Sequence, residues 1–222
     1  MKKTLLVAAV AISALFAGTA AMAQDAGSLS YNIAYTTDYV WRGIEQSASN
    51  SGALQGGIDY KKGTFYAGAW ASNVDFLSGK GKQADTELDL YLGLTPTVGN
   101  YSFDFGVIYY TYPGASDATF GELKGAVSHP MGKGTIGAAL YLPTEQLQDP
   151  YYEVNASYPL TDKLSISGAL GNYEQFNYTT SNIGLTYALT DKLGLDVRYT
   201  SASKGYDGSN HNYTMATLKA TF

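Results

Sequence analysis

The stretch from Glu87 to Val98 reads ELDLYLGLTPTV, and apolar residues occupy every second position. Leucine occupies every second position from Leu88 to Leu94, and acidic residues, Tyr91 or glycine fill the positions between them. Successive side chains of a β-strand point to opposite faces, so a period of two indicates a strand with one apolar face. A strand of about ten residues, tilted, is long enough to cross a membrane. The stretch therefore predicts a membrane-spanning strand.

Eleven further stretches with the same period surround this one, and no segment after the N-terminal leader shows the 3.6-residue period of a helix. The sequence thus predicts an all-β fold, an antiparallel up-and-down barrel of twelve strands that spans the outer membrane of a Gram-negative cell. The twelve predicted strands are residues 29–42, 53–60, 64–74, 87–98, 101–112, 120–130, 134–142, 151–160, 164–173, 180–189, 193–201 and 212–222. The strand at 64–74 is ambiguous in phase, because either its alanines or the pair Tyr66 and Trp70 could face lipid.

The predicted connections alternate between long and short, as the loops and turns of outer-membrane barrels do. The long ones are residues 43–52, 75–86, 113–119, 143–150, 174–179 and 202–211, and the short ones are 61–63, 99–100, 131–133, 161–163 and 190–192. Both chain ends then lie at the short-turn end of the barrel. Even the long loops have fewer residues than the loops of receptors, and we expect none of them to form a plug inside the barrel. Two short turns share the sequence Leu-Thr-Asp-Lys-Leu, at residues 160–164 and 189–193, which indicates one hairpin solution used twice.

The N-terminal segment has the three parts of a secretory signal peptide. Lys2 and Lys3 are basic, the residues from Leu5 to Ala17 are apolar, and an Ala-Met-Ala site ends at Ala23. The apolar run is shorter than the ~20 residues of a transmembrane helix. We expect residues 1–23 to be removed and residues 24–222 to form one domain. Without those 23 residues the chain has 199, and twelve basic residues face nineteen acidic ones, a net charge near −7.

Composition narrows the function further. The negative net charge argues against nucleic acid as a partner. The 222 residues include no cysteine, and no sequence motif for a cofactor or a metal is present. The 20 tyrosines suggest the aromatic belts found where barrels meet lipid headgroups. One belt would hold Tyr60, Tyr101, Tyr158, Tyr187 and Phe222, and the other Tyr39, Trp41, Tyr109, Tyr152 and Tyr199. Besides lipid, a terminal Phe222 suggests the barrel-assembly machinery as a partner.

Twelve charged residues fall on the inward phase and are the predicted pore lining. They are Asp38, Arg42, Asp59, Glu87, Asp89, Asp104, Glu122, Lys124, Glu153, Asp196, Arg198 and Lys219. Eight acids face four bases, and acidic rings favour cations. Asp38 and Arg42, about 13 Å apart on one strand, would pair with charges on neighbouring strands. They would either stiffen the barrel or form a charged constriction. The inward tyrosines Tyr91, Tyr110, Tyr151 and Tyr173 would narrow the lumen.

Three blocks carry a family resemblance. Residues 35–47, YTTDYVWRGIEQS, resemble the opening motif of the TorF family of proteobacterial porins, and residues 54–60 and 66–75 resemble its next two blocks. The resemblance implies an outer-membrane barrel that passes small hydrophilic solutes or ions, and it brings no catalytic residues.

Other interpretations stay open. A closed structural or interaction barrel without a pore is the alternative function. A barrel enzyme would need a histidine with Ser or Asp, and the only histidines are His129 near a short turn and His211 in a long loop. We therefore expect no enzyme. A soluble periplasmic β-sandwich is the third alternative, and solubility without detergent would reveal it.

Overall fold

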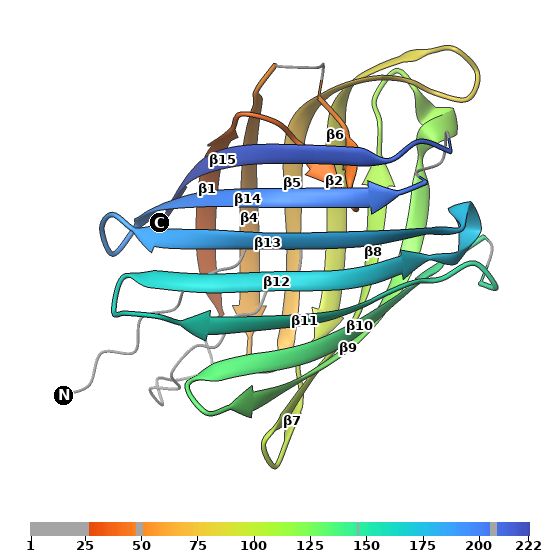
Figure 1. Ribbon diagram of the computed structural model, residues 1–222. Coiled ribbons are helices and arrows are strands. Elements are labelled where there is room, and N and C mark those ends of the chain that lie inside the picture. The colour runs from red at the N-terminus through yellow and green to blue at the C-terminus, as the bar shows by residue number, and fades with distance from the viewer. Residues whose placement is uncertain (1–26, 48–50, 146, 205–207) are drawn as a thin grey trace.

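The chain folds as a closed antiparallel β-barrel in a computed structural model that describes residues 27–47, 51–145, 147–204 and 208–222 (Figure 1). The signal peptide predicted at residues 1–23 lies outside the described residues. Within them, twelve strands form the wall. They are β1 (Ser28–Thr36), β4 (Ala53–Lys62), β5 (Phe65–Leu77), β6 (Gln83–Leu94), β8 (Tyr101–Thr111), β9 (Phe120–Met131), β10 (Gly134–Pro143), β11 (Tyr151–Pro159), β12 (Leu164–Tyr173), β13 (Tyr178–Ala188), β14 (Leu193–Ser203) and β15 (His211–Thr221). The described part contains no helix long and apolar enough to cross a membrane.

Each wall strand pairs with its neighbours in the sequence, and the first pairs with the last. Going round the barrel the order is β1, β4, β5, β6, β8, β9, β10, β11, β12, β13, β14, β15 and back to β1. The closing pair runs from Asn32 opposite Thr221 to Thr36 opposite Thr217. Tyr31 and Phe222 extend it through two backbone hydrogen bonds of 3.1 and 2.9 Å. Every wall strand thus has two partners, so the sheet has no free edge.

The predicted twelve-strand barrel is confirmed, and two of the predicted strands need correction. The prediction of one strand over residues 29–42 is wrong, because β1 ends at Thr36 and the chain then leaves the wall. The stretch from Glu87 to Val98 is interrupted as well. Strand β6 ends at Leu94, and a two-residue strand β7 (Thr97–Val98) resumes the pairing with β8. Pro96 lies at the break, and proline has no backbone N–H to donate to a ladder.

The wall has an apolar outer face and a polar inner face. The outward side chains include Leu90, Leu92 and Leu94 of β6, each about half exposed. The inner face buries Glu87, Asp89 and many other polar groups. This is the inverse of a soluble protein, and it is the arrangement expected of a barrel surrounded by lipid.

The ambiguous phase of β5 is also resolved by its contacts. Trp70 packs inside the barrel against Tyr39, with ring centroids 5.6 Å apart, and the hydroxyl of Tyr66 donates to Asp104 at 2.7 Å. The two aromatic residues therefore face inward, and Ala67, Ala69 and Ala71 face outward. A β-bulge between Asn73 and Phe76 interrupts the pairing of β5 with β6 near their long-loop ends.

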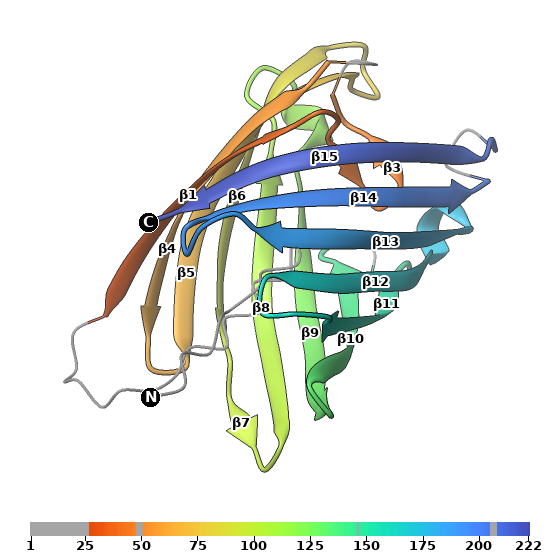
Figure 2. The ribbon, with the colours of Figure 1, turned by 60° about the vertical axis from the view of Figure 1, so that its left-hand side comes forward.

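Short turns and long loops lie at opposite ends of the barrel (Figure 2), which confirms the predicted alternation. The Leu-Thr-Asp-Lys-Leu turns have the same geometry. Thr161 Oγ accepts the backbone N–H of Lys163 and Leu164 at 3.2 and 3.0 Å, and the corresponding distances at Thr190 are 3.1 and 3.0 Å. One local solution therefore closes both hairpins.

The long-loop end carries short irregular elements. They are a 3₁₀ turn η1 (Ser116–Ala118), a second turn η2 (Glu174–Phe176), and the strands β2 (Val40–Trp41) and β3 (Ile44–Glu45). In η1, Asp117 Oδ2 accepts the backbone N–H of Lys80 at 3.1 Å, which ties that loop to the β5–β6 connection. A hydrogen bond from Ser78 lowers the pKa of the Asp117 carboxyl. Loops from separate hairpins thus hold one another.

Candidate functional site: a hairpin across the barrel interior

The connection between β1 and β4 turns into the barrel instead of standing above it. Val40 pairs with Glu45 and Trp41 with Ile44, which makes β2 and β3 a small antiparallel hairpin. Its two turn residues, Arg42 and Gly43, have φ of 47° and 78°. Two positive φ values are typical of the type I′ turn that suits two-residue hairpins. Glycine adopts this conformation freely, whereas for arginine it costs roughly 1–2 kcal/mol, which the contacts described below must offset.

Hydrogen bonds fasten the base of this β2–β3 hairpin. The N–H of Gln46 donates to the carbonyl of Tyr39 at 2.7 Å, and the N–H of Asp75 on β5 donates to the carbonyl of Gln46 at 2.7 Å. Ser47 Oγ accepts the N–H of Tyr39 at 3.0 Å and donates to the carboxylate of Asp38 at 3.2 Å. The hairpin is therefore joined to the wall at β5 as well as to the end of β1.

The tip of the hairpin reaches the far wall. Both oxygens of Glu122, on β9, accept hydrogen bonds from the two terminal nitrogens of Arg42 at 2.7 Å. The guanidinium also lies over the rings of Trp41, Tyr141, Tyr151 and Tyr173, at 4.2, 4.8, 4.1 and 5.1 Å from their centroids. The rings of the wall belong to β10, β11 and β12.

The strand order shows that this contact joins opposite sides of the barrel. From β1, strand β10 is the sixth in one direction, after β4, β5, β6, β8 and β9, and the sixth in the other, after β15, β14, β13, β12 and β11. A chain segment that leaves β1 and touches β9 to β12 therefore crosses the barrel along a diameter. The hairpin divides the interior at this level.

Aromatic side chains fill the space around the hairpin. Trp41 packs edge-on against Tyr110 and Tyr173, at 5.8 and 6.2 Å, and lies 6.1 Å from Phe120. On the opposite side of the barrel, Tyr39 meets Trp70. The prediction that Tyr39 and Trp41 belong to a lipid-facing belt is wrong, because both point into the interior.

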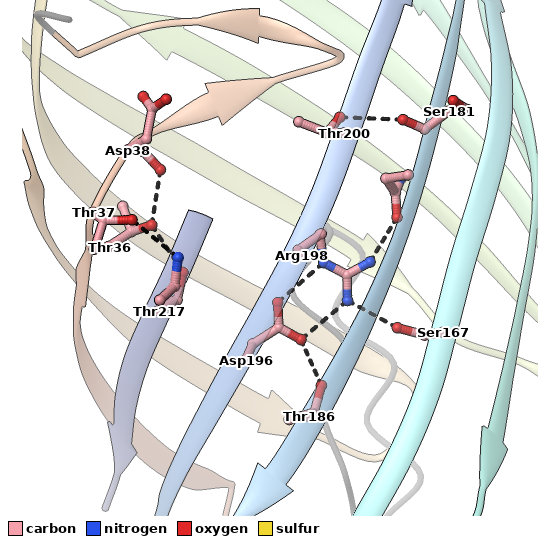
Figure 3. A network of polar contacts seen from close by, with 12 residues as sticks. Thr36, Thr37, Asp38, Ser167, Ser181, Thr186, Asp196, Arg198, Thr200 and Thr217 are labelled. Carbon is pink, nitrogen blue, oxygen red and sulfur yellow. Dashed lines mark hydrogen bonds and ion pairs between the residues drawn. The ribbon is translucent and has the colours of Figure 1, made fainter. Parts of the chain in front are cut away.

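Two further charge networks line the inner wall. Lys124 Nζ contacts Asp104 at 2.6 Å. Arg198 contacts both oxygens of Asp196 at 3.1 Å, and its guanidinium also donates to Asn182 at 2.6 Å and to Ser167 at 2.9 Å (Figure 3). Three neighbouring strands, β12 to β14, thus share one buried guanidinium, which is how a polar inner wall is kept rigid.

Four of the predicted pore-lining acids have no basic partner in contact among the described residues: Asp38, Glu87, Asp89 and Glu153. Glu87 and Asp89 are each 2% exposed. Glu87 accepts a hydrogen bond from Tyr112 at 3.0 Å, but its second oxygen and one oxygen of Asp89 have no hydrogen-bond partner in the described part of the chain. Glu153 accepts hydrogen bonds from Tyr151 and Asn155. Another predicted acid, Asp59, accepts a hydrogen bond from the Tyr91 hydroxyl and lies within electrostatic reach of Lys219.

The structure therefore places ten of the twelve predicted residues on inward positions of wall strands, and it corrects the other two. Asp38 and Arg42 do not lie on a wall strand, and Arg42 pairs with the opposite wall instead of a neighbouring strand. The expectation that no loop enters the barrel is also wrong, because the connection between β1 and β4 forms the β2–β3 hairpin inside it. One signal was visible: Thr37 is a polar residue on the apolar phase, so the alternation already fails there.

Sequence reasoning also missed Tyr141, which completes the ring cluster around Arg42. The two histidines lie apart from this site. His129 stacks on Tyr101 with centroids 4.6 Å apart, and His211 lies beside Tyr213. No group of three His, Cys, Asp or Glu residues in the described ranges is placed to hold a metal ion.

Comparison with known proteins places the chain in a family and a fold. The family model Gcw_chp, described as a bacterial protein of unknown function, matches residues 20–222. No curated protein matches the sequence. The similar solved structures include the KdgM porin, with a TM-score of 0.64 and 9% identity over 87% of this chain and 99% of that one. The same porin has been solved in complex with disordered oligogalacturonate.

Two other similar structures have the same kind of barrel. The NanC porin has a TM-score of 0.57 and 10% identity, covering 88% of this chain and 99% of that one. The Salmonella typhi outer membrane phospholipase, a dimer with bound calcium, has a TM-score of 0.51 and 13% identity over 86% and 89% of the two chains. At such identities the likeness shows the fold, an outer-membrane barrel that serves both porins and an enzyme.

Proposed function

The chain belongs to the bacterial family Gcw_chp, and we propose that it is an outer-membrane channel for small hydrophilic solutes or ions with a preference for cations. The barrel it shares with the KdgM and NanC porins supports a channel, as does the resemblance of residues 35–75 to the TorF porins. The charge of the interior supports the preference.

The observation that carries the proposal is the surplus of acids inside the barrel. Three of the four predicted pore-lining bases are bound to Glu122, Asp104 and Asp196, and Lys219 lies near Asp59. Among the described residues, these contacts leave four acids without a base: Asp38, Glu87, Asp89 and Glu153. Asp38 and Glu153 are the partly exposed members of this set. A narrow passage bounded by low-dielectric walls concentrates the field of such carboxylates, so cations enter more readily than anions.

The same surplus bears on the solute. The ligand in the KdgM complex is oligogalacturonate, a sugar chain with one carboxylate on each unit. A polyanion of this kind would be repelled by Asp38 and Glu153, the partly exposed acids that lack a base in this barrel. We therefore propose that this channel passes cationic, neutral or zwitterionic solutes.

A closed barrel is the second candidate function, and one specific observation favours it: the β2–β3 hairpin crosses the interior along a diameter. In this version the hairpin is a permanent plug, and the exposed loops carry the function through interactions. We assign the barrel no catalytic role, because His129 packs on Tyr101 at the outer face and His211 pairs with Tyr213.

Planar-bilayer recordings of the refolded protein test the channel and its selectivity together. We expect a reversal potential of the cation-selective sign in a salt gradient, and a smaller one for the double variant Asp38→Asn with Glu153→Gln. Glu145→Gln with Asp162→Asn is the matched control, because it removes two charges from an exposed loop and an exposed turn. Anion selectivity would contradict the preference. Repeated absence of current from correctly folded protein would favour the closed barrel.

We also propose how the protein reaches the membrane: export through a signal peptide cleaved after Ala23, then insertion by the barrel-assembly machinery, which reads the last strand. Phe222 directly follows that strand and pairs with Tyr31 through the backbone, and its ring centroid lies 5.7 Å from Lys192 Nζ. We expect Phe222→Ala to lower the yield of inserted barrel in cells several-fold but to leave refolding into detergent unchanged. Equal loss in both assays would instead indicate a purely structural role, and N-terminal mass spectrometry of the inserted protein tests the cleavage site.

A further inference from the structure

The wall around Arg42 has the composition of a binding site for a flat cation. We call it the Arg42 cage and define it by Tyr110, Glu122, Tyr141, Tyr151 and Tyr173. All five residues belong to wall strands, so the framework of the cage does not depend on the hairpin. The occupant comes from a different segment of the chain, 80 residues before Glu122.

The cage is held in shape by its own hydrogen bonds. The hydroxyl of Tyr110 donates to Glu122 at 3.1 Å. The hydroxyl of Tyr151 lies 2.9 Å from Thr180 Oγ and 3.1 Å from a carboxylate oxygen of Glu153. Glu153 is therefore a second acid beside the cage, and its charge acts in the same direction as that of Glu122.

Without the Arg42 side chain, the cage would hold an unneutralised acid. Glu122 is fully buried, and apart from Arg42 only Tyr110 donates a hydrogen bond to it among the described residues. Aromatic faces that surround a site attract cations through their negative quadrupoles, and a carboxylate binds a guanidinium through two parallel hydrogen bonds. The cage offers both features at once, and Arg42 demonstrates the fit.

We infer that the Arg42 cage is a binding site for a guanidinium-type cation carried by a solute, and that Arg42 occupies it as a tethered internal ligand. A solute that bears this group competes with Arg42 for Glu122 and releases the tip of the hairpin from the far wall. Passage through the opened interior rests on the proposed channel, whereas binding to the cage does not.

The variant Arg42→Gly vacates the cage with little effect on the turn. The residue has a positive φ, which glycine adopts without strain. Guanidinium chloride at 0–20 mM is the probe, and Trp41, whose ring lies 4.2 Å from the guanidinium carbon of Arg42, reports binding by its fluorescence in a Trp70→Phe background. We expect saturable binding with a dissociation constant of roughly 1–10 mM, because so small a ligand has few atoms with which to gain affinity.

Three controls define the site. Urea has the same shape without the charge and is expected to give no saturable signal, and sodium chloride at equal ionic strength is expected to give none either. Glu122→Gln added to Arg42→Gly is expected to weaken binding at least fivefold. In the wild type, tethered Arg42 should raise the apparent dissociation constant at least tenfold. An equal response to urea or sodium, or no effect of Glu122→Gln, would overturn the proposal.

Folding and channel activity are measured separately. Heat-modifiable migration in gels confirms that each variant forms a barrel. If Arg42→Gly does not fold, Arg42→Gln takes its place in the same titration. In bilayers, Arg42→Gly should conduct more than the wild type, and guanidinium should reduce that current. Binding without current upholds the cage and contradicts the channel. Current without guanidinium binding upholds the channel and overturns the cage.

Discussion

At the scale of single residues, the placement of glycine and tyrosine explains an unusual composition. Tyr66 extends across two strands to donate to Asp104, and its hydroxyl would lie 2.5 and 2.6 Å from a Cβ added at Gly93 or Gly106. Gly68 lies under the ring of Tyr91 in the same way. These glycines are there because a neighbouring ring occupies the space in which their side chain would lie.

The effect of adding one methyl group to a glycine should therefore depend on whether the glycine faces the interior, as Gly93 does, or the outside of the barrel, as Gly125 does. Gly93→Ala would bring its Cβ to 2.5 Å from the carbonyl oxygen of Phe105 and from Tyr66, so we expect it to destabilise the barrel by about 1–3 kcal/mol. Gly125→Ala is the matched control in another wall strand. Its Cβ would meet no atom within 4 Å, so we expect no loss or a gain of about 0.5 kcal/mol. Urea unfolding in vesicles measures both, and equal losses would contradict the packing argument.

Arg42 is the residue with the widest consequence. Its backbone has an unfavourable positive φ at the hairpin tip. Its guanidinium binds both oxygens of the Glu122 carboxylate and lies over four aromatic rings, and these contacts offset that cost. Glu122 is buried without any other cation in contact within the described ranges, so each partner neutralises a charge that the interior would otherwise have to hold.

At the scale of elements, the turns at the short-loop end are local and repeat. In both Leu-Thr-Asp-Lys-Leu turns a threonine hydroxyl accepts two backbone N–H groups. These hydrogen bonds depend on neighbours in the sequence alone. Such a turn can therefore be recognised before the rest of the barrel is known.

The two turns offer a test of this independence. Thr161→Ala and Thr190→Ala should each cost about 0.5–1.5 kcal/mol in unfolding free energy, because each leaves two backbone donors without the hydroxyl that accepts them. Their effects should add in the double variant, since they share no partner. Thr→Ser at either position keeps the hydroxyl and should recover most of the loss. A strongly non-additive double variant in urea unfolding would show that the two turns are coupled.

The β2–β3 hairpin follows a different rule. It has only two residues in each strand, and its fixed position comes from contacts with wall strands far away in the sequence. Residues 37–42 look like the continuation of a strand when read alone, because Tyr39 and Trp41 keep the apolar phase. Their rings find partners inside the barrel, where the inner faces of other strands supply an aromatic surface.

At the scale of the whole molecule, the barrel has two solvents. Its outer face is covered with leucine, valine, phenylalanine and tyrosine, and its interior holds buried charged residues such as Glu122, Asp196 and Arg198. Because the wall closes on itself through β1 and β15, no backbone edge is left to face lipid.

A charge on the outer face should thus be costly in proportion to its depth. Leu92 faces outward on β6, paired with Ala67 and Val107, and is half exposed. We expect Leu92→Arg to destabilise the barrel in lipid vesicles by about 2–4 kcal/mol, whereas Leu77→Arg at the long-loop end should cost about 0–1 kcal/mol. Reversible urea unfolding in vesicles measures the difference. Equal costs would show that lipid does not cover this face at Leu92.

The sequence by itself determined the fold class, eleven of the twelve wall strands to within four residues at each end, the alternation of loops and turns, and the inward position of ten charged residues. Period-two alternation and short turns are local, so they are legible in the sequence. Only the tertiary structure decided where residues 37–47 go, which acids lack a base, and that Arg42 meets Glu122. These depend on barrel closure, which brings β9 to β12 opposite β1 across one interior, and no local pattern specifies which side chains meet there.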